Sequence, residues 1–256
     1  AVGGRTRAIL VDSRDPSGNT LWAGGVSGGL WKCTNFLQED AVWELIGDGF
    51  KSIAISSIVQ NPERPEEMYF STGEGWFNAD ASLGLGIWKS ENGGIDWKLL
   101  TSTIDGKFSY TQKLLYQNGN LWAATRDNGL MQTNDGGMTW RKLLGSDIGG
   151  AYSDRAADIE VASDGTLFAS FGILSSDGIY RSKDGGETWI DLIEEGEGLP
   201  QENFERIELA IAPSNPQVAY AIFTDTEEQE AMGIYRTADQ GMTWDSMPEP
   251  NAYGMD

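Results

Sequence analysis

The sequence predicts an all-β protein made of repeated four-stranded antiparallel blades. Three observations predict this class: a motif that occurs five times, a regular distance between its copies, and a composition rich in glycine and aromatic residues. The chain of 256 residues holds 33 glycines and 10 tryptophans. Short, well-packed strands joined by many tight turns require such a composition.

The repeated motif is a glycine-led strand followed by a turn that closes with tryptophan. The leading glycines are Gly29, Gly86, Gly129, Gly178 and Gly233. The closing tryptophans follow one another at distances of 43 to 55 residues. A period near 50 residues suits the four-stranded blade of a β-propeller. We therefore expect one β-propeller domain or propeller fragment over residues 1–256, with blades at about 5–45, 50–99, 110–142, 155–191 and 205–246.

The strand order within each expected blade follows from the local pattern. A run of alternating apolar and polar residues comes first, as at residues 7–12 and 206–212. A turn follows, often with Asn-Pro or Asp-Gly, and then a second strand. The glycine-led segment is the third strand, and the tryptophan opens the fourth. No segment has a convincing helical pattern, so we expect no helix.

The turn of the motif has the form S/T-x-D-x-G-x-T-W, and its chemistry indicates a structural role. The hydroxyl and carboxylate can accept hydrogen bonds from turn amides, glycine supplies a positive φ, and tryptophan packs between blades. The residues expected in this role are Ser90, Asn92, Trp97, Thr133, Asp135, Trp140, Ser182, Asp184, Trp189, Thr237, Asp239 and Trp244. The second copy departs from the pattern with Asn92 and Asp96. The first copy has Cys33 and Asn35, and then three extra residues before Trp43.

This motif resembles the Asp box, also called the bacterial neuraminidase repeat. Asp-box propellers occur in sialidases, in xyloglucanase-type glycosidases and in sortilin-type receptor ectodomains. The pattern of strand, Asn-Pro, strand and Gly-Gly-Leu-Trp-Lys is most similar to the xyloglucanase and sortilin groups, and to propellers of large secreted bacterial surface proteins. The resemblance covers nearly the whole chain. It implies the fold clearly and the function poorly, because one fold serves many functions.

The enzymes of these families can be compared residue by residue. The xyloglucanase-type resemblance implies a catalytic aspartate before the Gly-Gly of the first blade, where this chain has Val26. The sialidase resemblance implies an arginine cluster, which Arg126, Arg155 and Arg206 could supply. Glycoside hydrolysis needs paired carboxylates. Asp158 and Glu208 occupy matching positions in the inner strands of the fourth and fifth blades. They either face a central channel or form ion pairs with Arg155 and Arg206, and the second alternative is favoured.

The ligand-binding face is expected on the loops between second and third strands, because a rigid scaffold positions such loops. The longest spans residues 73–85 and carries Glu74, Trp76, Phe77 and Asp80. Exposed aromatic rings beside carboxylates suit a sugar ring or a protein partner. Trp76 is either an exposed anchor or a plug for its own loop. The remaining candidate ligand contacts are Arg126, Tyr152, Arg155, Asp158, Arg206 and Glu208.

Charge and composition exclude several classes of function. The net charge of −21 disfavours nucleic acid as a partner. Histidine is absent and there is one cysteine, so we expect no catalytic histidine, metal site or cofactor. No apolar stretch approaches the 18 residues of a membrane span, so direct membrane insertion is not expected.

The favoured function is a non-catalytic extracellular binding or scaffold module for a glycan or protein ligand. The alternative is a glycoside hydrolase of xyloglucanase or sialidase type, or an inactive remnant of one. The family resemblance and acidic composition predict a secreted or cell-surface protein of bacterial origin. The chain begins at a first strand and ends after a fourth strand. We therefore expect part of a longer propeller, with further domains beyond it.

Overall fold

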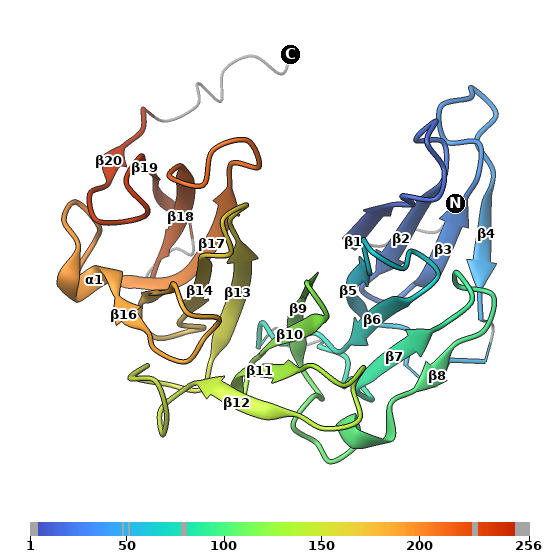
Figure 1. The fold of residues 1–256 in the computed structure, drawn as a ribbon, viewed down its shortest axis with the longest axis horizontal. Coiled ribbons are helices and arrows are strands. Elements are labelled where there is room, and N and C mark those ends of the chain that lie inside the picture. Colours follow the sequence, from blue (N-terminus) through green and yellow to red (C-terminus); the bar gives the residue numbers. More distant parts are fainter. Residues whose placement is uncertain (1–4, 48, 51, 78–80, 227–229, 249–256) are drawn as a thin grey trace. The chain divides into compact units, whose positions relative to one another are not determined.

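The computed structural model describes residues 5–47, 49–50, 52–77, 81–226 and 230–248. The chain divides into two compact units, Ala1–Lys142 and Leu143–Asp256, and each is described here by itself. The described strands form five four-stranded antiparallel sheets, and in each sheet the strands lie side by side in chain order (Figure 1). We number these sheets 1 to 5 along the chain. The predicted all-β class is confirmed.

The strands are short and evenly distributed among the sheets. Sheet 1 holds β1 (Thr6–Val11), β2 (Leu21–Gly25), β3 (Gly29–Cys33) and β4 (Trp43–Ile46). Sheet 2 holds β5 (Ile55–Gln60), β6 (Met68–Thr72), β7 (Ile87–Ser90) and β8 (Lys98–Leu99). Sheet 3 holds β9 (Thr111–Gln117), β10 (Asn120–Thr125), β11 (Gly129–Thr133) and β12 (Arg141–Leu144). Sheet 4 holds β13 (Ala156–Val161), β14 (Leu167–Phe171), β15 (Ile179–Ser182) and β16 (Ile190–Asp191). Sheet 5 holds β17 (Phe204–Ile211), β18 (Ala219–Asp225), β19 (Ala231–Thr237) and β20 (Asp245–Ser246).

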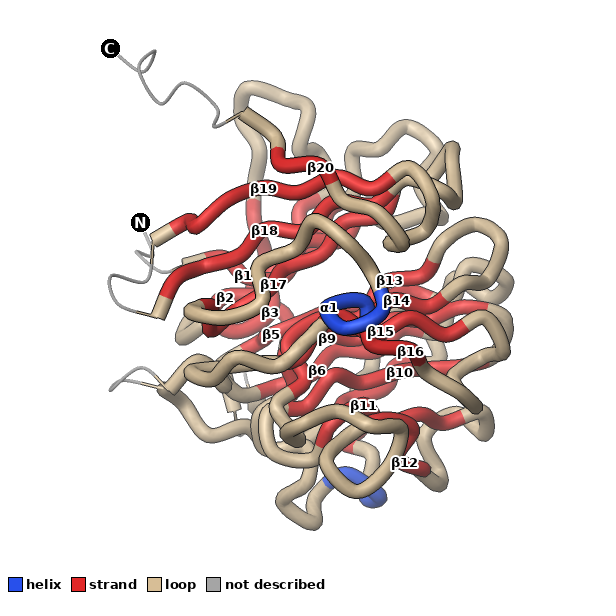
Figure 2. Tube along the Cα trace, turned by 90° about the vertical axis from the view of Figure 1, so that its left-hand side faces the viewer, coloured by secondary structure: helices blue, strands red, loops and turns tan. Residues whose placement is uncertain are grey.

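Two short helical turns interrupt this pattern (Figure 2). They are the 3-10 turn η1 (Thr101–Thr103) and the α-helix α1 (Leu192–Glu195). The expectation of no helix was therefore wrong at α1. The Asp191 carboxylate accepts hydrogen bonds from the amides of Ile193 and Glu194, which caps the helix. Four residues are too few to produce a helical period in the sequence.

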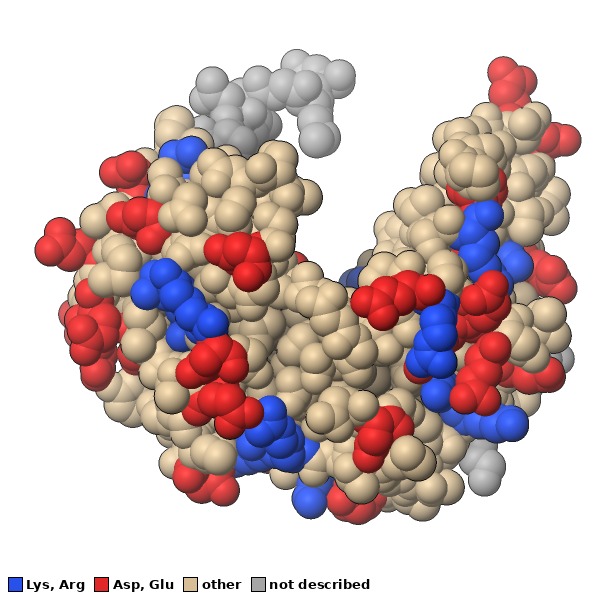
Figure 3. All heavy atoms as spheres, viewed as in Figure 1, with Lys and Arg blue, Asp and Glu red and all other residues tan. Residues whose placement is uncertain are grey.

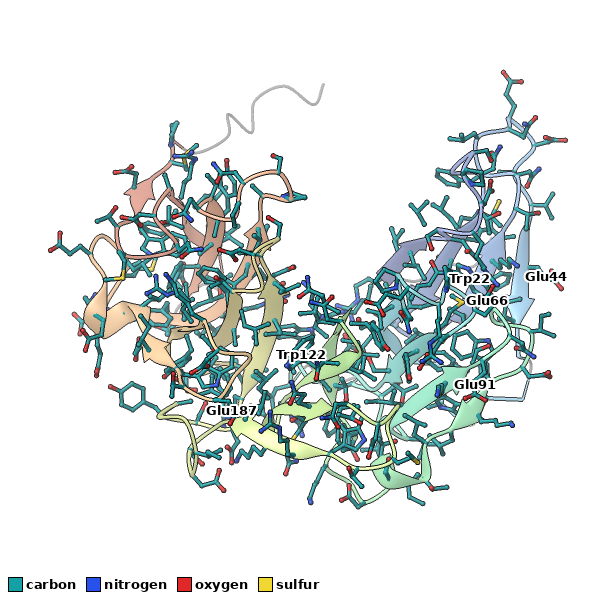
Figure 4. The ribbon with its side chains drawn as sticks, viewed as in Figure 1. Trp22, Glu44, Glu66, Glu91, Trp122 and Glu187 are labelled. Carbon is teal, nitrogen blue, oxygen red and sulfur yellow. The ribbon has the colours of Figure 1, made fainter. Side chains whose placement is uncertain are left out.

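The core lies between neighbouring sheets, because each sheet is apolar on both faces. In the first unit, Ala8, Trp22 and Leu30 of sheet 1 pack with Ile58 and Phe70 of sheet 2. Trp22 on β2 is fully buried (Figure 4), and its indole Nε1 donates to Asp12 at 3.0 Å. Burial of each large apolar side chain contributes about 1.5–3 kcal/mol. Tyr69 and Ile87 form the matching contact with sheet 3, and Phe168 and Ile179 form it between sheets 4 and 5.

The turn between the third and fourth strands recurs with nearly the same hydrogen bonds. In sheet 3, the Thr133 hydroxyl donates to Asp135 Oδ1 at 2.7 Å and accepts from the Gly137 amide at 3.1 Å. The Asp135 carboxylate also accepts from the amide and hydroxyl of Thr139. These bonds, led by that of the Thr139 hydroxyl, hold the pKa of Asp135 well below its usual range. We call these segments box turns: residues 90–97, 133–140, 182–189 and 237–244.

Acidic side chains dominate the charge of the molecule. The net charge is −21, and Figure 3 shows Asp and Glu over both units on the face in view, with Lys and Arg between them.

Candidate functional site

The loop between β6 and β7 is fixed at its base by backbone contacts that require glycine. The Thr72 hydroxyl accepts from the Leu85 amide and donates to the Gly86 carbonyl, both at 2.8 Å. Gly73 has φ +99°, and a Cβ there would lie 2.0 Å from the Ser109 carbonyl oxygen. No larger residue fits, so the loop starts at a fixed position against the linker that precedes sheet 3.

Glu74, the first side chain of this loop, is a buried carboxylate that lies beside two arginines. Arg7 belongs to β1, and Arg5 directly precedes that strand. Glu74 is only 3% exposed. Its Oε1 lies 2.8 Å from Arg5 Nη2 and 3.9 Å from Arg7 Nη1. Its Oε2 is buried and has no hydrogen-bond partner among the described residues. A buried carboxylate oxygen without a donor is costly, so this atom is suited to receive one from a ligand or from water.

Gln112 of β9 lies against the next residue of the loop. Its Oε1 accepts from the Gly75 amide at 3.3 Å, and a Cβ on Gly75 would lie 3.0 Å from the side-chain amide. Its Nε2 is buried and has no acceptor among the described residues. The site therefore holds one unsatisfied acceptor on Glu74 and one unsatisfied donor on Gln112. A hydroxyl group can donate to the first kind of atom and accept from the second.

Two aromatic rings of the same loop lie against arginines. The Arg7 guanidinium is 5.1 Å from the centre of the Trp76 ring. The Arg126 guanidinium lies 4.3 Å from the Phe77 ring centre and 3.6 Å from that of Tyr110. Such cation–π contacts are worth about 0.5–2 kcal/mol each and fix the planes of the rings.

Phe77 is held in an unusual conformation. Its φ is +59°, which is strained for a bulky side chain, and the residue is exposed. Strained conformations persist only where the surroundings enforce them, and they cluster at functional sites. Arg126 is itself fixed, because its Nε and Nη2 donate to the Asp127 carboxylate at 3.0 and 2.7 Å. The structure therefore presents an aromatic side chain in a predefined position.

We call this group the loop cluster; its members are Arg5, Arg7, Glu74, Trp76, Phe77, Tyr110, Gln112 and Arg126. The structure thus brings together four of the residues singled out from the sequence: Glu74, Trp76, Phe77 and Arg126. Trp76 is half-buried, between the two alternatives of anchor and plug, and Phe77 is the exposed ring. Asp80 lies outside the described residues. Tyr110 and Gln112 carried no sequence signal, because neither belongs to the loop.

The remaining candidates belong to the second unit, where the inner-strand carboxylates have structural partners. Asp158 is buried, and its two oxygens accept from the backbone amides of Ile159 at 2.7 Å and Leu209 at 2.9 Å. It thereby joins β13 to β17. Glu208 forms an ion pair with Arg206, whose Nε lies 3.0 Å from its Oε1. Arg155 donates to the Ile173 carbonyl at 2.7 Å.

Tyr152 lies in a separate polar group of the second unit. Its hydroxyl donates to Glu194, and this bond raises the pKa of Tyr152 to about 12. Its amide lies 3.3 Å from Asp177, a buried carboxylate that also accepts from Ser153 and Tyr180. Every oxygen of Asp177 is thus engaged, which indicates a structural group.

Val26 occupies the turn between β2 and β3 and is buried. Its amide donates to the Arg5 carbonyl at 3.0 Å. The Arg5 side chain in turn forms an ion pair with Glu74 of the β6–β7 loop. Arg5 therefore connects the turn that carries Val26 to the Glu74 carboxylate.

The described part of the chain offers neither a metal site nor a membrane-spanning helix. No group of three or more Cys, Asp or Glu side chains there could hold a metal ion. None of its helices is sufficiently long and apolar to cross a membrane.

Two curated proteins resemble the chain in sequence, although no protein-family model matches it. A xyloglucanase of a Paenibacillus species is 25% identical over 249 aligned residues, which cover 84% of this chain and 23% of that protein. An oligoxyloglucan-reducing end-specific xyloglucanase of Emericella nidulans is 32% identical over 120 residues, 43% of this chain and 15% of that protein. The chain thus spans less than a quarter of the length of either relative.

Solved structures establish the architecture. An ancestral GH74 enzyme has a TM-score of 0.72 at 17% identity, covering 96% of this chain and 31% of that one. The GH74 xyloglucanase from Xanthomonas campestris has a TM-score of 0.60 at 15% identity, covering 96% and 46%. YCF48 bound to D1 peptide has a TM-score of 0.60 at 15% identity, covering 98% and 69%. At these identities the likeness concerns the fold alone. The chain has the fold of a β-propeller with four-stranded antiparallel blades, as the sequence predicted.

Proposed function

We propose that the chain is a glycan-binding part of a glycoside hydrolase of xyloglucanase type, and that the loop cluster contacts the sugar chain. The main support is that both curated relatives are xyloglucanases, one of them aligned over 84% of this chain. This replaces the non-catalytic module favoured from the sequence with the alternative given there. The ligand class is then a neutral β-linked glucan that carries side-chain sugars.

The chemistry of the loop cluster supports a sugar ligand. Sugar rings have apolar faces that pack on aromatic rings, and Phe77 offers such a ring in a fixed position. Their hydroxyl groups both donate and accept, which matches the unsatisfied Glu74 and Gln112 atoms. Arg5 and Arg7 orient the Glu74 carboxylate, with Arg5 Nη2 at 2.8 Å and Arg7 Nη1 at 3.9 Å from its Oε1. A carboxylate, an amide and an aromatic ring in one loop cluster form a suitable polyhydroxyl site.

Binding to the loop cluster is tested with the purified chain, xyloglucan oligosaccharides and isothermal titration calorimetry. Phe77→Ala should weaken binding about 30-fold, since loss of an anchoring ring commonly costs about 2 kcal/mol. Tyr152→Phe in the second unit is the matched control and should bind like the unaltered chain. Unchanged affinity in Phe77→Ala would exclude the loop cluster as the sugar site.

Hydrolysis is tested separately by the release of reducing ends from xyloglucan. Glu74→Gln keeps the size of the side chain and removes its charge. If Glu74 takes part in turnover, this variant should lose hydrolysis and still bind. Because the chain is proposed as part of a larger enzyme, the same assay is run on the full-length protein, and binding without any turnover there would restore the non-catalytic module as the better description.

The box turns and the cellular location complete the proposal. We assign residues 90–97, 133–140, 182–189 and 237–244 to Asp-box repeats, because in each a Ser or Thr hydroxyl donates to the side-chain oxygen of the Asp or Asn two residues later.

We also propose that the protein acts outside a bacterial cell, where polysaccharide is accessible. Recovery of the native protein in the cytoplasmic fraction alone would contradict this location.

A further inference from the structure

A cavity lies between the box turns of sheets 2 and 3, within the first unit. Its volume is about 870 Å³, and small-molecule sites commonly have about 300–1,000 Å³. No member of the loop cluster lines it, so it is separate from the proposed sugar contact. The walls come from the end of β7, the two box turns, β8 and η1, and they include Lys89, Glu91, Asp96, Lys98, Asp135 and Met138.

Two lysines of this cavity stand directly opposite each other. The ladder of β7 and β8 pairs Lys89 with Lys98. Directly paired residues of an antiparallel ladder share one face, with their Cβ atoms about 4.5–5.5 Å apart, and like charges in this arrangement repel. The cavity therefore contains an arrangement of charges that is unfavourable in the absence of an anion.

Other sheets have the favourable arrangement at the matching position. In sheet 1 the third strand pairs Lys32 with Glu44, and in sheet 5 it pairs Arg236 with Asp245. Each of these pairs places a cation opposite a carboxylate. In sheet 2 the cation is kept and the carboxylate is replaced by Lys98. The repeat thus departs from its own pattern at the position that lines the cavity.

The charges of the two lysines are balanced to different degrees. Lys89 Nζ lies 3.4 Å from Oε1 of the buried Glu67 and 3.0 Å from Glu91 Oε1. Glu91 directly follows β7 and is labelled in Figure 4. Lys98 is exposed and forms no ion pair with any residue that the structure describes. Lys98 therefore carries the unbalanced positive charge of the cavity.

The carboxylates of the lining already have donors. Glu91 takes part in the ion pair just described. Asp96 Oδ2 accepts from the Asn92 side-chain amide at 2.9 Å, and Asp135 Oδ2 accepts from the Thr139 hydroxyl at 2.6 Å. Because an ionised carboxylate has about four acceptor sites, each can also accept from a hydroxyl group of a ligand. The cavity thus offers one unbalanced cation surrounded by acceptors for hydroxyl groups.

A ligand that matches this lining carries a single carboxylate and several hydroxyl groups. A polyanion is disfavoured, because the protein has a net charge of −21 and three carboxylates line the cavity. We propose that the cavity binds a hexuronic acid residue of a polysaccharide, with the carboxylate of the sugar on Lys98 and its hydroxyl groups on Asp96 and Asp135. That a sugar carries the carboxylate rests on the proposed function, whereas the charge of the ligand follows from the cavity alone.

The test compares methyl β-D-glucuronide with methyl β-D-glucoside, because these sugars differ only in the carboxylate. Binding is followed by NMR of the chain labelled with ¹³C in its methionine methyl groups. Met138 lines the cavity and is 73% exposed, whereas Met131 of β11 is 5% exposed and serves as the internal reference. The glucuronide should shift the Met138 signal with a dissociation constant about tenfold or more below that of the glucoside, since hydrogen bonds between charged groups are the stronger ones.

Three variants locate the binding. Lys98→Glu recreates the pairing of sheets 1 and 5, so it should weaken glucuronide binding about tenfold or more without lowering the thermal midpoint. Lys183→Glu makes the same change of charge at the position that Glu91 occupies in sheet 2, and it should bind like the unaltered chain. Phe77→Ala should not alter glucuronide binding, and Lys98→Glu should not alter the binding of xyloglucan oligosaccharides. The two proposals can therefore fail independently.

Four results would overturn the inference. Equal affinity for the two sugars, or no shift of the Met138 signal with either, would exclude a carboxylate site in the cavity. Unchanged glucuronide affinity in Lys98→Glu would place the ligand elsewhere. A tripeptide with blocked ends and a central aspartate that shifts the Met138 signal at lower concentration than the glucuronide would identify an acidic protein segment as the ligand.

Discussion

The box turns of sheets 2 and 3 have the same shape, but their closing hydrogen bonds run in opposite directions. In sheet 3, the Thr139 hydroxyl donates to the Asp135 carboxylate at 2.6 Å. In sheet 2, the Asn92 side-chain amide donates to the Asp96 carboxylate at 2.9 Å. The backbone bond is the same in both turns, because Asn92 Oδ1 accepts from the Asp96 amide as Asp135 Oδ1 accepts from the Thr139 amide.

The difference teaches that the turn needs one side-chain oxygen that accepts from a backbone amide. It also needs one bond between two side chains, and either side chain can be the donor of that bond. Asn92 and Asp96 each depart from the repeated pattern, yet together they keep both bonds. The two departures therefore compensate: Asp96 opposite an aspartate would place two acceptors against each other, and Asn92 supplies the missing donor.

The largest expected effect concerns the second glycine of each turn. A Cβ on Gly94 would lie 2.3 Å from the buried ring of Trp22, and one on Gly137 would lie 2.4 Å from the end of the Leu100 side chain. Both glycines have positive φ, so both changes to alanine are strained. The Trp22 ring is rigid and Leu100 can change rotamer. Gly94→Ala should therefore cost about 3 kcal/mol of unfolding free energy, and Gly137→Ala about 1–2 kcal/mol.

These two variants are compared by urea unfolding of the chain. Because the backbone strain is shared, their difference isolates the packing against the neighbouring sheet. Equal losses would show that strain alone decides the outcome.

A smaller effect is expected when the compensation between Asn92 and Asp96 is broken. Asn92→Asp should destabilise the chain by about 1 kcal/mol, because two carboxylates then face each other at an exposed site. Adding Asp96→Thr should restore the stability, since it recreates the arrangement of sheet 3. The thermal midpoints of the single and double variants give the comparison. An equally unstable double variant would mean that the direction of the bond is fixed in sheet 2 by other contacts.

The smallest effect is in the response to acid. Burial opposes ionisation of Asp239, but hydrogen bonds from Thr243 and Thr237 outweigh it and lower its pKa to about 2 from the usual 3.8. A carboxylate with a lowered folded pKa stabilises the protein fully above its unfolded pKa. This contribution is lost as the pH falls from about 4 through the folded value. Asn92 cannot titrate, so it adds no such loss to the turn of sheet 2.

Carboxyl carbon NMR between pH 5 and 1.5 follows these groups directly. The Asp239 signal should titrate near pH 2, and Asp135 well below its usual range. A midpoint near 4 for Asp239 would show that its hydrogen bonds are not maintained in solution.

The fold was predictable because its repeated motif consists of residue types that have specific roles in turns. In four of the five copies a Ser or Thr, an Asp or Asn, a glycine and a tryptophan recur at the same spacing, and the turn chemistry then orders the strands. The α1 helix was not predictable, since a four-residue helix capped by Asp191 leaves no periodic signal.

The candidate site was predictable only where one loop carries its residues. Glu74, Trp76 and Phe77 belong to a long loop, and long loops carry function. Arg5 directly precedes β1, Tyr110 directly precedes β9, and Gln112 lies in β9. Only the packing of neighbouring sheets brings these residues to that loop. Asp158 and Glu208 matched in sequence position. One bonds to a backbone amide of the next sheet and the other to Arg206, so matching position does not imply a common role.

The glycine contacts of the box turns also bear on how such a protein can change over generations. Gly94 meets Trp22 of the sheet before it, and Gly137 and Gly241 meet Leu100 and Leu192, which directly follow the last strands of the sheets before them. The connection between adjacent blades is therefore carried by a small number of residues on each side, repeated along the gene. A duplicated or deleted segment of about fifty residues keeps both halves of this connection. Blade number can thus change by unequal recombination without a new interface having to arise.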